Sequence, residues 1–174
     1  MSHALKDQAA IAGIGLTEFS KKSGVSELSL AAQATLAGLP PSEIDGFVSY
    51  TLDSTDEIEL ARTVGANDLK LFTKVNYGGG AAVGTILHAV MAVATGVADN
   101  VICYRAMNGR SGQRMGQGIS GQIVSSDLVH WSWYMPYGML TPGSWIAMIA
   151  NKYMHRYGVT SEDLGRVAIS QRNY

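Results

Sequence analysis

The stretch LKLFTKVNYGGGAAVGTILHAVMAVAT, residues 69–95, decides the fold of this chain. Apolar and polar residues alternate over residues 69–75, which is typical of a β-strand with one wetter face. The consecutive glycines Gly78–Gly80 then predict a tight turn. Residues 81–95 are apolar on almost every side, a composition typical of a helix in the middle of a protein. The stretch therefore predicts a strand, a glycine-rich turn and a buried helix.

The preceding and following segments repeat this alternation of strand and helix. Residues 9–15 are a short apolar run closed by glycines, which predicts a buried strand. Ser26 stands where a helix N-cap belongs, and apolar residues recur at helical spacing over residues 28–39. Apolar runs at residues 46–50 and 101–107 predict two further strands. Short apolar strands joined by helices favour a parallel sheet, so the predicted class is α/β.

The chain changes character after residue 107. Residues 108–141 contain glycines and then clustered aromatic side chains, and a connection of this length is typical of a lid, a binding loop or an interface arm. Thr141 and Pro142 have the chemistry of a helix start. A last helix beginning at Thr160 shows no stop signal before Tyr174, so we expect a truncated chain. The expected segments are a core in residues 1–107, a loop insertion in residues 108–141 and helices of the same domain in residues 142–174.

Composition excludes several classes of protein. With 174 residues, of which 47% are hydrophobic and 16% charged, the chain can bury a core and is not intrinsically disordered. A net charge of −1 gives no field that would attract nucleic acid or acidic lipid. The single cysteine cannot form an internal disulfide, and no signal peptide or membrane-spanning stretch is recognised. We therefore expect a soluble, cytoplasmic protein.

The glycine turn is the sharpest local feature that points to function. Backbone N–H groups at a helix N-terminus can bind a phosphate, a carboxylate or a thioester oxyanion, and glycines let a bulky ligand approach the main chain. The alternative is close packing of the helix against its strand. Dinucleotide binding is disfavoured because Val83 stands where the third glycine of that motif belongs. Walker-type phosphate binding is disfavoured because no Gly-Lys-Ser/Thr follows.

The remaining candidate groups favour structural roles. Cys103 lies within a predicted strand, away from any helix N-terminus or basic cluster that would activate it. The four histidines lack metal-ligand spacing, so no metal is expected; we place His88 in the core, whereas His130 could line a pocket. Arg105 and two following arginines could bind phosphate groups, but a solvated position is favoured. The aromatic residues of 131–139 would cover an apolar ligand or a subunit neighbour, or pack in the core.

Several segments together resemble one known family. They are GIGLTEFS at 13–20, NYGGGAA at 76–82, MAVATGVA at 91–98, YRAMN at 104–108 and MIANKYMH at 148–155. With them, nearly the whole chain resembles the thiolase superfamily, specifically its lipid-transfer-protein branch, which includes steroid side-chain aldolases.

This resemblance implies an architecture. Members of the superfamily comprise two similar halves, each a sheet flanked by helices, with the two central helices packed face to face. The chain resembles the N-terminal half of such a protein, so the resemblance implies a C-terminal half beyond this sequence. The resemblance implies a thiolase-like fold with a mixed, mostly parallel sheet, a buried central helix at residues 81–95 and a loop insertion.

The resemblance also implies a chemistry. In ordinary thiolases the turn before the central helix carries a nucleophilic cysteine, and the corresponding residue here is Gly80 or Gly79. This loss favours the aldolase branch, which cleaves a β-hydroxyacyl-CoA thioester by retro-aldol chemistry and here would release a ketone and propionyl-CoA. The proposed acid and base groups of the family are tyrosines of the other half, so no catalytic residue is assigned in this chain. No cofactor is expected, because the CoA thioester is the substrate.

The substrate-binding residues expected in this chain come from the turn and from the loop insertion. They are Tyr77, Gly78, Gly79, Gly80, His130, Tyr134 and Tyr137. The resemblance implies a homodimer that joins a zinc-ribbon/OB-fold partner protein binding acyl-CoA. Two alternatives remain open: a non-catalytic acyl-CoA or lipid carrier, and a conventional acetyl-CoA acyltransferase.

Overall fold

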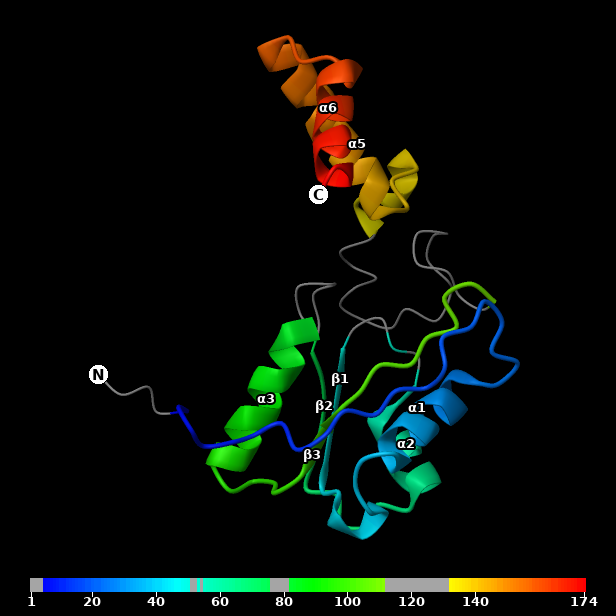
Figure 1. The fold of residues 1–174 in the computed structure, drawn as a ribbon, viewed down its shortest axis with the longest axis vertical. Helices are drawn as coiled ribbons and strands as arrows, with labels where there is room; N and C mark the ends of the chain where they lie inside the picture. Colours follow the sequence, from blue (N-terminus) through cyan, green and yellow to red (C-terminus); the bar gives the residue numbers. More distant parts are fainter. Residues whose placement is uncertain (1–4, 51–52, 54, 76–81, 112–131) are drawn as a thin grey trace. The chain divides into compact units, whose positions relative to one another are not determined.

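The computed structural model describes residues 5–50, 53, 55–75, 82–111 and 132–174 (Figure 1). The chain divides into two compact units, Met1–Gly112 and Gln113–Tyr174. The described part of the first unit is an α/β structure, and that of the second unit is helical.

Three parallel strands form the sheet of the first unit. They are β1, Gly46–Tyr50, β2, Leu71–Val75, and β3, Val101–Cys103, and they lie in the order β2-β1-β3. Gly46 pairs with Leu71 on one side and with Val101 on the other. A Cβ at Gly46 would lie 2.9 Å from Val101 Cγ2, so this start of β1 needs a glycine. The parallel strands predicted at residues 46–50 and 69–75 are confirmed, and the one predicted at 101–107 is confirmed over Val101–Cys103. The antiparallel member of the expected mixed sheet is not found among the described residues.

Helices cover both faces of this sheet (Figure 1). Helix α1, Glu27–Leu36, packs on α2, Glu57–Val64, and α2 contacts β1 and β2. Helix α3, Ala82–Ala94, contacts all three strands from the opposite face. A short 3-10 helix, η1, Pro41–Glu43, leads into β1. The arrangement is the layered one that alternating strands and helices predict.

Local sequence signals explain where the first two α-helices begin and end. The side chain of Ser26 accepts a hydrogen bond from Ser29 N–H, so the predicted N-cap of α1 is confirmed. Helix α2 is an element that the sequence analysis did not predict. Asp56 precedes it as N-cap, and Gly65 follows it in the left-handed conformation with φ 84°. These two residues are the start and stop signals that could have revealed it.

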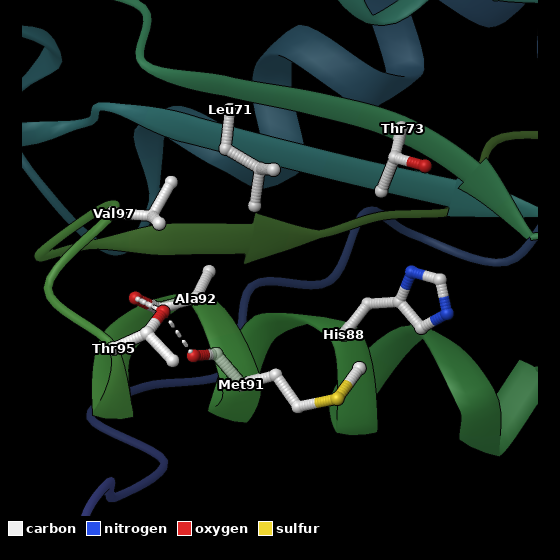
Figure 2. Close-up of a pocket in the computed structure, with 7 residues that line it drawn as sticks. All are labelled: Leu71, Thr73, His88, Met91, Ala92, Thr95 and Val97. Atoms are coloured by element: carbon white, nitrogen blue, oxygen red, sulfur yellow. Dashed lines mark hydrogen bonds between the residues drawn. The ribbon is translucent and has the colours of Figure 1, made fainter.

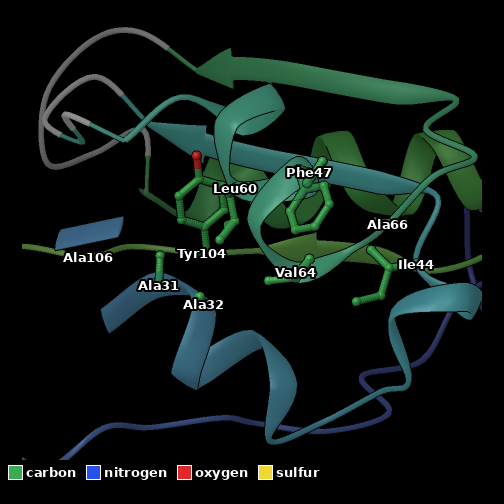
Figure 3. Packing of buried hydrophobic residues seen from close by; sticks show 10 residues of the cluster. Ala31, Ala32, Ile44, Phe47, Leu60, Val64, Ala66, Tyr104 and Ala106 are labelled. Carbon is green, nitrogen blue, oxygen red and sulfur yellow. The ribbon is translucent and has the colours of Figure 1, made fainter. Parts of the chain in front are cut away.

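The core of this unit lies between the sheet and the α1/α2 layer (Figure 3). Phe47 of β1 and Leu60 of α2 are fully buried there. The ring of Phe47 meets the ring of Tyr104 edge-on, with centroids 6.2 Å apart and an interplanar angle of 79°. The small side chains of Ala31 and Ala32 let α1 approach this layer closely. This cluster fixes α2, and with it the chain that leaves β1.

The buried strand predicted for residues 9–15 is wrong. These residues form neither a helix nor a strand, and Ile11 and Ile14 are 75% and 80% exposed. An apolar run becomes a buried strand only where another strand pairs with its backbone. Residues 9–15 have no such partner in the β2-β1-β3 sheet.

The predicted central helix is confirmed, and its burial against a second half stays a prediction. Thr85 and Ala92 of α3 are buried, but Val83 is 75% exposed and Leu87 is 51% exposed. One sheet face covers only one side of a helix, so the apolar outer side of α3 stays uncovered in this chain.

The described part of the second unit contains two long helices. They are α5, Pro142–Tyr157, and α6, Ser161–Arg172, preceded by the 3-10 helix η3, Met135–Tyr137. Thr141 caps α5 as predicted, because its side chain accepts a hydrogen bond from Ser144 N–H. Helix α6 ends at Arg172, two residues before the position to which it was expected to continue. No helix in the described part of the chain combines the length and the apolar content needed to cross a membrane.

Candidate functional site

The carboxyl ends of the three parallel strands lie at one edge of the sheet. Open α/β sheets bind ligands outside these ends, where the connecting loops diverge. Strand β2 ends at Val75, and the glycine turn follows it within a few residues of sequence. Strand β3 leads into residues 104–108 at the same edge. We call this region the carboxyl edge and take it as the candidate site.

Asp53 connects the ends of all three strands at the carboxyl edge. Its N–H donates to the carbonyl oxygen of Tyr50, the last residue of β1, at 2.9 Å. Its Oδ1 accepts a hydrogen bond from Ala106 N–H, beyond β3, at 2.8 Å. Its carbonyl oxygen accepts one from Nζ of Lys74, in β2, at 3.2 Å. One residue therefore ties together the three chain segments that approach the site.

The carboxylate of Asp53 is unusual because it is buried and incompletely hydrogen-bonded. Asp53 is 5% exposed, and its Oδ2 has no hydrogen-bond partner among the described residues. Burial raises the pKa of this carboxyl to about 6, although Ala106 N–H and the charges of Arg105 and Lys74 favour the ionised form. Asp53 therefore changes its charge within the range of ordinary solution conditions.

A second buried polar cluster joins strands β1 and β3 to the start of α2. Tyr104 Oη donates to the carbonyl oxygen of Thr55 at 2.7 Å, and Ser49 Oγ donates to Glu57 Oε1. All four residues are less than a tenth exposed. Burial, with the nearby charge of Glu57, raises the pKa of Tyr104 well above its usual value. Tyr104 is therefore a hydrogen-bond donor at neutral pH and not a source of phenolate.

Two cationic side chains reach solvent at the carboxyl edge. Nζ of Lys74 lies 3.7 Å from Oδ1 of Asp56, and the guanidinium carbon of Arg105 lies 5.0 Å from the ring centroid of Tyr50. Arg105 is exposed, which agrees with the solvated position that the sequence favoured. The edge thus combines a buried carboxylate with two more accessible cations.

The sequence-predicted binding residues fall into two groups. Tyr77, Gly78–Gly80 and His130 lie outside the described residues. Tyr134 and Tyr137 belong to the second unit. The ring of Tyr134 is half-buried and lies 5.2 Å from that of Trp145, whereas Tyr137 is 80% exposed. Their grouping into one site therefore stays a prediction.

Cys103 is not an activated nucleophile. Its Sγ donates to the carbonyl oxygen of Thr85 in α3 at 3.5 Å. Although part of the residue is exposed, desolvation of the sulfur raises the pKa of the thiol above its usual value. A raised pKa disfavours the thiolate, so the structural role predicted for this cysteine is supported.

A groove of about 260 Å³ runs between β2 and α3 (Figure 2). Leu71 and Thr73 line it from the strand, and His88 and Met91 line it from the helix. His88 is half-buried at this groove and does not lie in the core as expected. The lining is mostly apolar, and within the described residues no three metal-ligating side chains come together there or elsewhere.

A parallel sheet covered by helices on both faces, with polar groups at its carboxyl edge, defines an open α/β protein with a candidate site at that edge. No family model matches the chain. It is 53% identical over 177 residues to the steroid side-chain-cleaving aldolase of Thermomonospora curvata, a match that covers 98% of this chain and 45% of that protein. It is 50% identical over 177 residues to the 17-hydroxy-3-oxo-4-pregnene-20-carboxyl-CoA lyase of Mycobacterium tuberculosis, which covers 98% of this chain and 46% of that protein.

This chain is also similar to a solved structure. A chain of the Ltp2-ChsH2(DUF35) aldolase superposes with a TM-score of 0.74 at 53% sequence identity, covering 94% of this chain and 42% of that chain. This chain therefore spans less than half the length of the curated relatives that it matches.

Proposed function

We propose that this chain is the N-terminal part of a thiolase-like aldolase that cleaves a carbon–carbon bond in the side chain of a steroid CoA thioester. The observation that carries the proposal is the likeness to the two relatives, one named an aldolase and the other a lyase, at 53% and 50% identity over 98% of the chain. The thiolase-like fold is part of the same proposal, and the parallel sheet with helices on both faces supports it.

The reaction is a retro-aldol cleavage of a β-hydroxyacyl-CoA. A base removes the proton of the β-hydroxyl group, the bond between Cα and Cβ breaks, and a ketone forms at Cβ. The electron pair passes into the thioester as an enolate, which is protonated at Cα to give propionyl-CoA. This chemistry needs a base and hydrogen-bond donors at the thioester oxygen. We place the acid and base residues in the C-terminal half and none of them in this chain.

This chain supplies the wall of the thioester site in the proposal. Backbone N–H groups of Gly78, Gly79 and Gly80 bind the thioester oxygen, beside Tyr77, and His130, Tyr134 and Tyr137 contact the substrate. Strand β2 ends at the carboxyl edge, and the glycine turn follows it in the sequence, which supports this placement. Loss of the thiolase nucleophile at Gly79 or Gly80 is consistent with a reaction that forms no acyl-enzyme.

The proposal includes partners. The solved relative is named as an assembly of Ltp2 with ChsH2(DUF35), which supports a second protein in the complex. We infer that this partner is a zinc-ribbon/OB-fold protein that binds acyl-CoA and that the aldolase forms a homodimer. Our candidates for the dimer and partner contacts are the strand at residues 69–75 and the loop at residues 108–141; β2 is an edge of the described sheet, and Phe72 on it is 55% exposed, which supports the first of them.

Incubation of the complete enzyme and its partner with a β-hydroxy steroid-CoA tests this function. We expect a ketone and propionyl-CoA in equal amounts. An intact thioester would contradict the aldolase and support a carrier, and thiolysis of acetoacetyl-CoA would support a conventional acyltransferase. The partner protein alone is the control, because cleavage by it would remove this chain from the reaction.

A further inference from the structure

Two buried aspartates hold opposite ends of the same sheet. Asp45 precedes β1, and its carboxylate accepts hydrogen bonds from Asp99 and Asn100 N–H, both at 2.8 Å. Lys70 Nζ, next to β2, lies 3.1 Å from Asp45 Oδ2. Asp45 therefore joins the amino ends of the three strands, as Asp53 joins their carboxyl ends.

The two carboxylates differ in the number of hydrogen bonds and ion pairs that they accept. Burial acts to raise the pKa of Asp45, but the two N–H groups and Lys70 hold it below its usual value. Asp53 receives one N–H on Oδ1 and none on Oδ2 within the described residues. Asp45 is thus a well-paired structural carboxylate, whereas ionisation of Asp53 lowers the stability of the folded state.

The bonds around Asp53 do not by themselves require a carboxylate. An asparagine could accept the same hydrogen bond from Ala106 N–H through its side-chain oxygen, and the Lys74 contact uses the backbone carbonyl. Asparagine would avoid the burial of a charge. Positions where a sequence departs from what stability favours are expected at functional sites.

We propose that Asp53 is a positioning residue for the aldol cleavage, holding the end of β1, Lys74 of β2 and the segment after β3 together at the carboxyl edge, beside the cation Arg105. This role rests on the proposed function. Asp53 acts through Ala106 and Lys74, and it does not itself touch the substrate. The charge matters because Lys74 and Arg105 are attracted to the ionised carboxylate and only weakly to an amide.

Several charged and titratable groups face Asp53 and must be considered in any pH dependence. Lys74 from β2, with Arg105 and Tyr104 from the chain after β3, act on Asp53 directly, whereas Glu57 and Asp56 at the start of α2 act on Tyr104, and Asp56 also pairs with Lys74. The two cations favour the ionised form of Asp53. Tyr104 stays protonated through neutral pH because its pKa is raised. A change in kcat/KM near pH 6 that is seen in the wild type and is absent from Asp53→Asn is therefore assigned to Asp53.

The test compares Asp53→Asn and Asp45→Asn in the complete enzyme with its partner. For Asp53→Asn we expect kcat/KM for steroid-CoA cleavage to fall at least about tenfold at neutral pH, while the melting temperature stays the same or rises. For Asp45→Asn we expect the reverse, a lower melting temperature with kcat/KM within about twofold when measured well below it. A merely structural aspartate would not separate activity from stability in this way.

Three results would overturn the role. One is kcat/KM of Asp53→Asn within about twofold of the wild type from pH 5.5 to pH 8. Another is a parallel loss of activity and melting temperature. If Asp53→Asn does not fold, the wild-type pH profile decides: kcat/KM should fall as the pH drops through about 6, and a flat profile contradicts the proposal. Absence of cleavage by the wild type would instead contradict the proposed function, and this role with it.

Discussion

The hydroxyl group of Tyr104 donates a hydrogen bond to the carbonyl oxygen of Thr55, with 2.7 Å between the two oxygen atoms. This bond joins the end of β3 to the chain immediately before α2, two segments that are 49 residues apart in the sequence. Because both residues are buried, water cannot replace either group if the bond is lost. The contact therefore helps to fix Thr55, at the start of the chain that leads into α2.

Tyr104→Phe tests this contact. The variant keeps the ring against Phe47 but leaves the carbonyl oxygen of Thr55 buried and unpaired, so we expect a loss of about 1–3 kcal/mol in the free energy of unfolding. Urea unfolding of the complete enzyme measures it. Tyr174→Phe is the matched control, because Tyr174 is exposed in this chain and belongs to the second unit, so that its substitution should change stability by less than about 0.5 kcal/mol. Equal stability of the two variants would contradict the prediction.

Asp53 should make stability fall as the pH rises. The pKa of its carboxyl is about 6 in the folded protein, compared with about 3.9 in an unfolded chain, so the folded state binds the proton more tightly. The stabilisation is fully present below about pH 4 and is lost as the pH rises through about 6. Asp53→Asn removes this loss, so the variant should gain up to about 3 kcal/mol relative to the wild type between pH 4 and pH 7. Urea unfolding at several pH values checks this, and a constant difference would contradict it.

Asp45 should show the opposite dependence. Its pKa is lowered in the folded state, so its contribution is present above the unfolded pKa of about 3.9 and is lost as the pH falls. At neutral pH we expect Asp45→Asn to cost about 2 kcal/mol, because hydrogen bonds to a charged acceptor are lost. The same unfolding series measures it. An unchanged midpoint at pH 7 would show that the three donors find other acceptors.

Gly79 and Gly80 should tolerate no side chain if the glycine turn binds the thioester. We expect Gly79→Val and Gly80→Val to lower kcat/KM for cleavage by at least about tenfold and to weaken thioester binding, because a Cβ would prevent close approach to the main chain. Gly165→Val is the control, because a Cβ at this α6 position has open space around it. Steady-state kinetics and binding of a non-cleavable thioester analogue measure the effect. Unchanged affinity and rate in both turn variants would end the assignment.

Cys103 should be dispensable for catalysis. Cys103→Ala removes a thiol whose pKa is raised and whose Sγ is engaged with Thr85, so we expect kcat/KM within about twofold of the wild type. The wild-type thiol should also react slowly with iodoacetamide at neutral pH. Loss of cleavage in Cys103→Ala, with normal folding, would instead favour a thiolase-type acyl-enzyme.

Local sequence patterns predicted much of the secondary structure. The strands at β1, β2 and β3 and the caps Ser26 and Thr141 could be predicted because alternation, apolar runs and capping hydroxyls act over a few residues. Helix α2 was missed because it is short and its start signal lies in a polar run after β1. That run, DSTDE at residues 53–57, also contains Asp53, which was not predicted as a functional residue.

The sequence by itself determined the α/β class, the order of strand, glycine turn and helix, and the likeness to a steroid side-chain aldolase. Only the tertiary structure decided which apolar surfaces are buried, as residues 9–15 and the outer side of α3 show. It also decided that Asp53 meets Ala106 and Lys74. The physical reason is that burial and hydrogen bonding depend on which surfaces pack together, and those surfaces come from residues far apart in the chain.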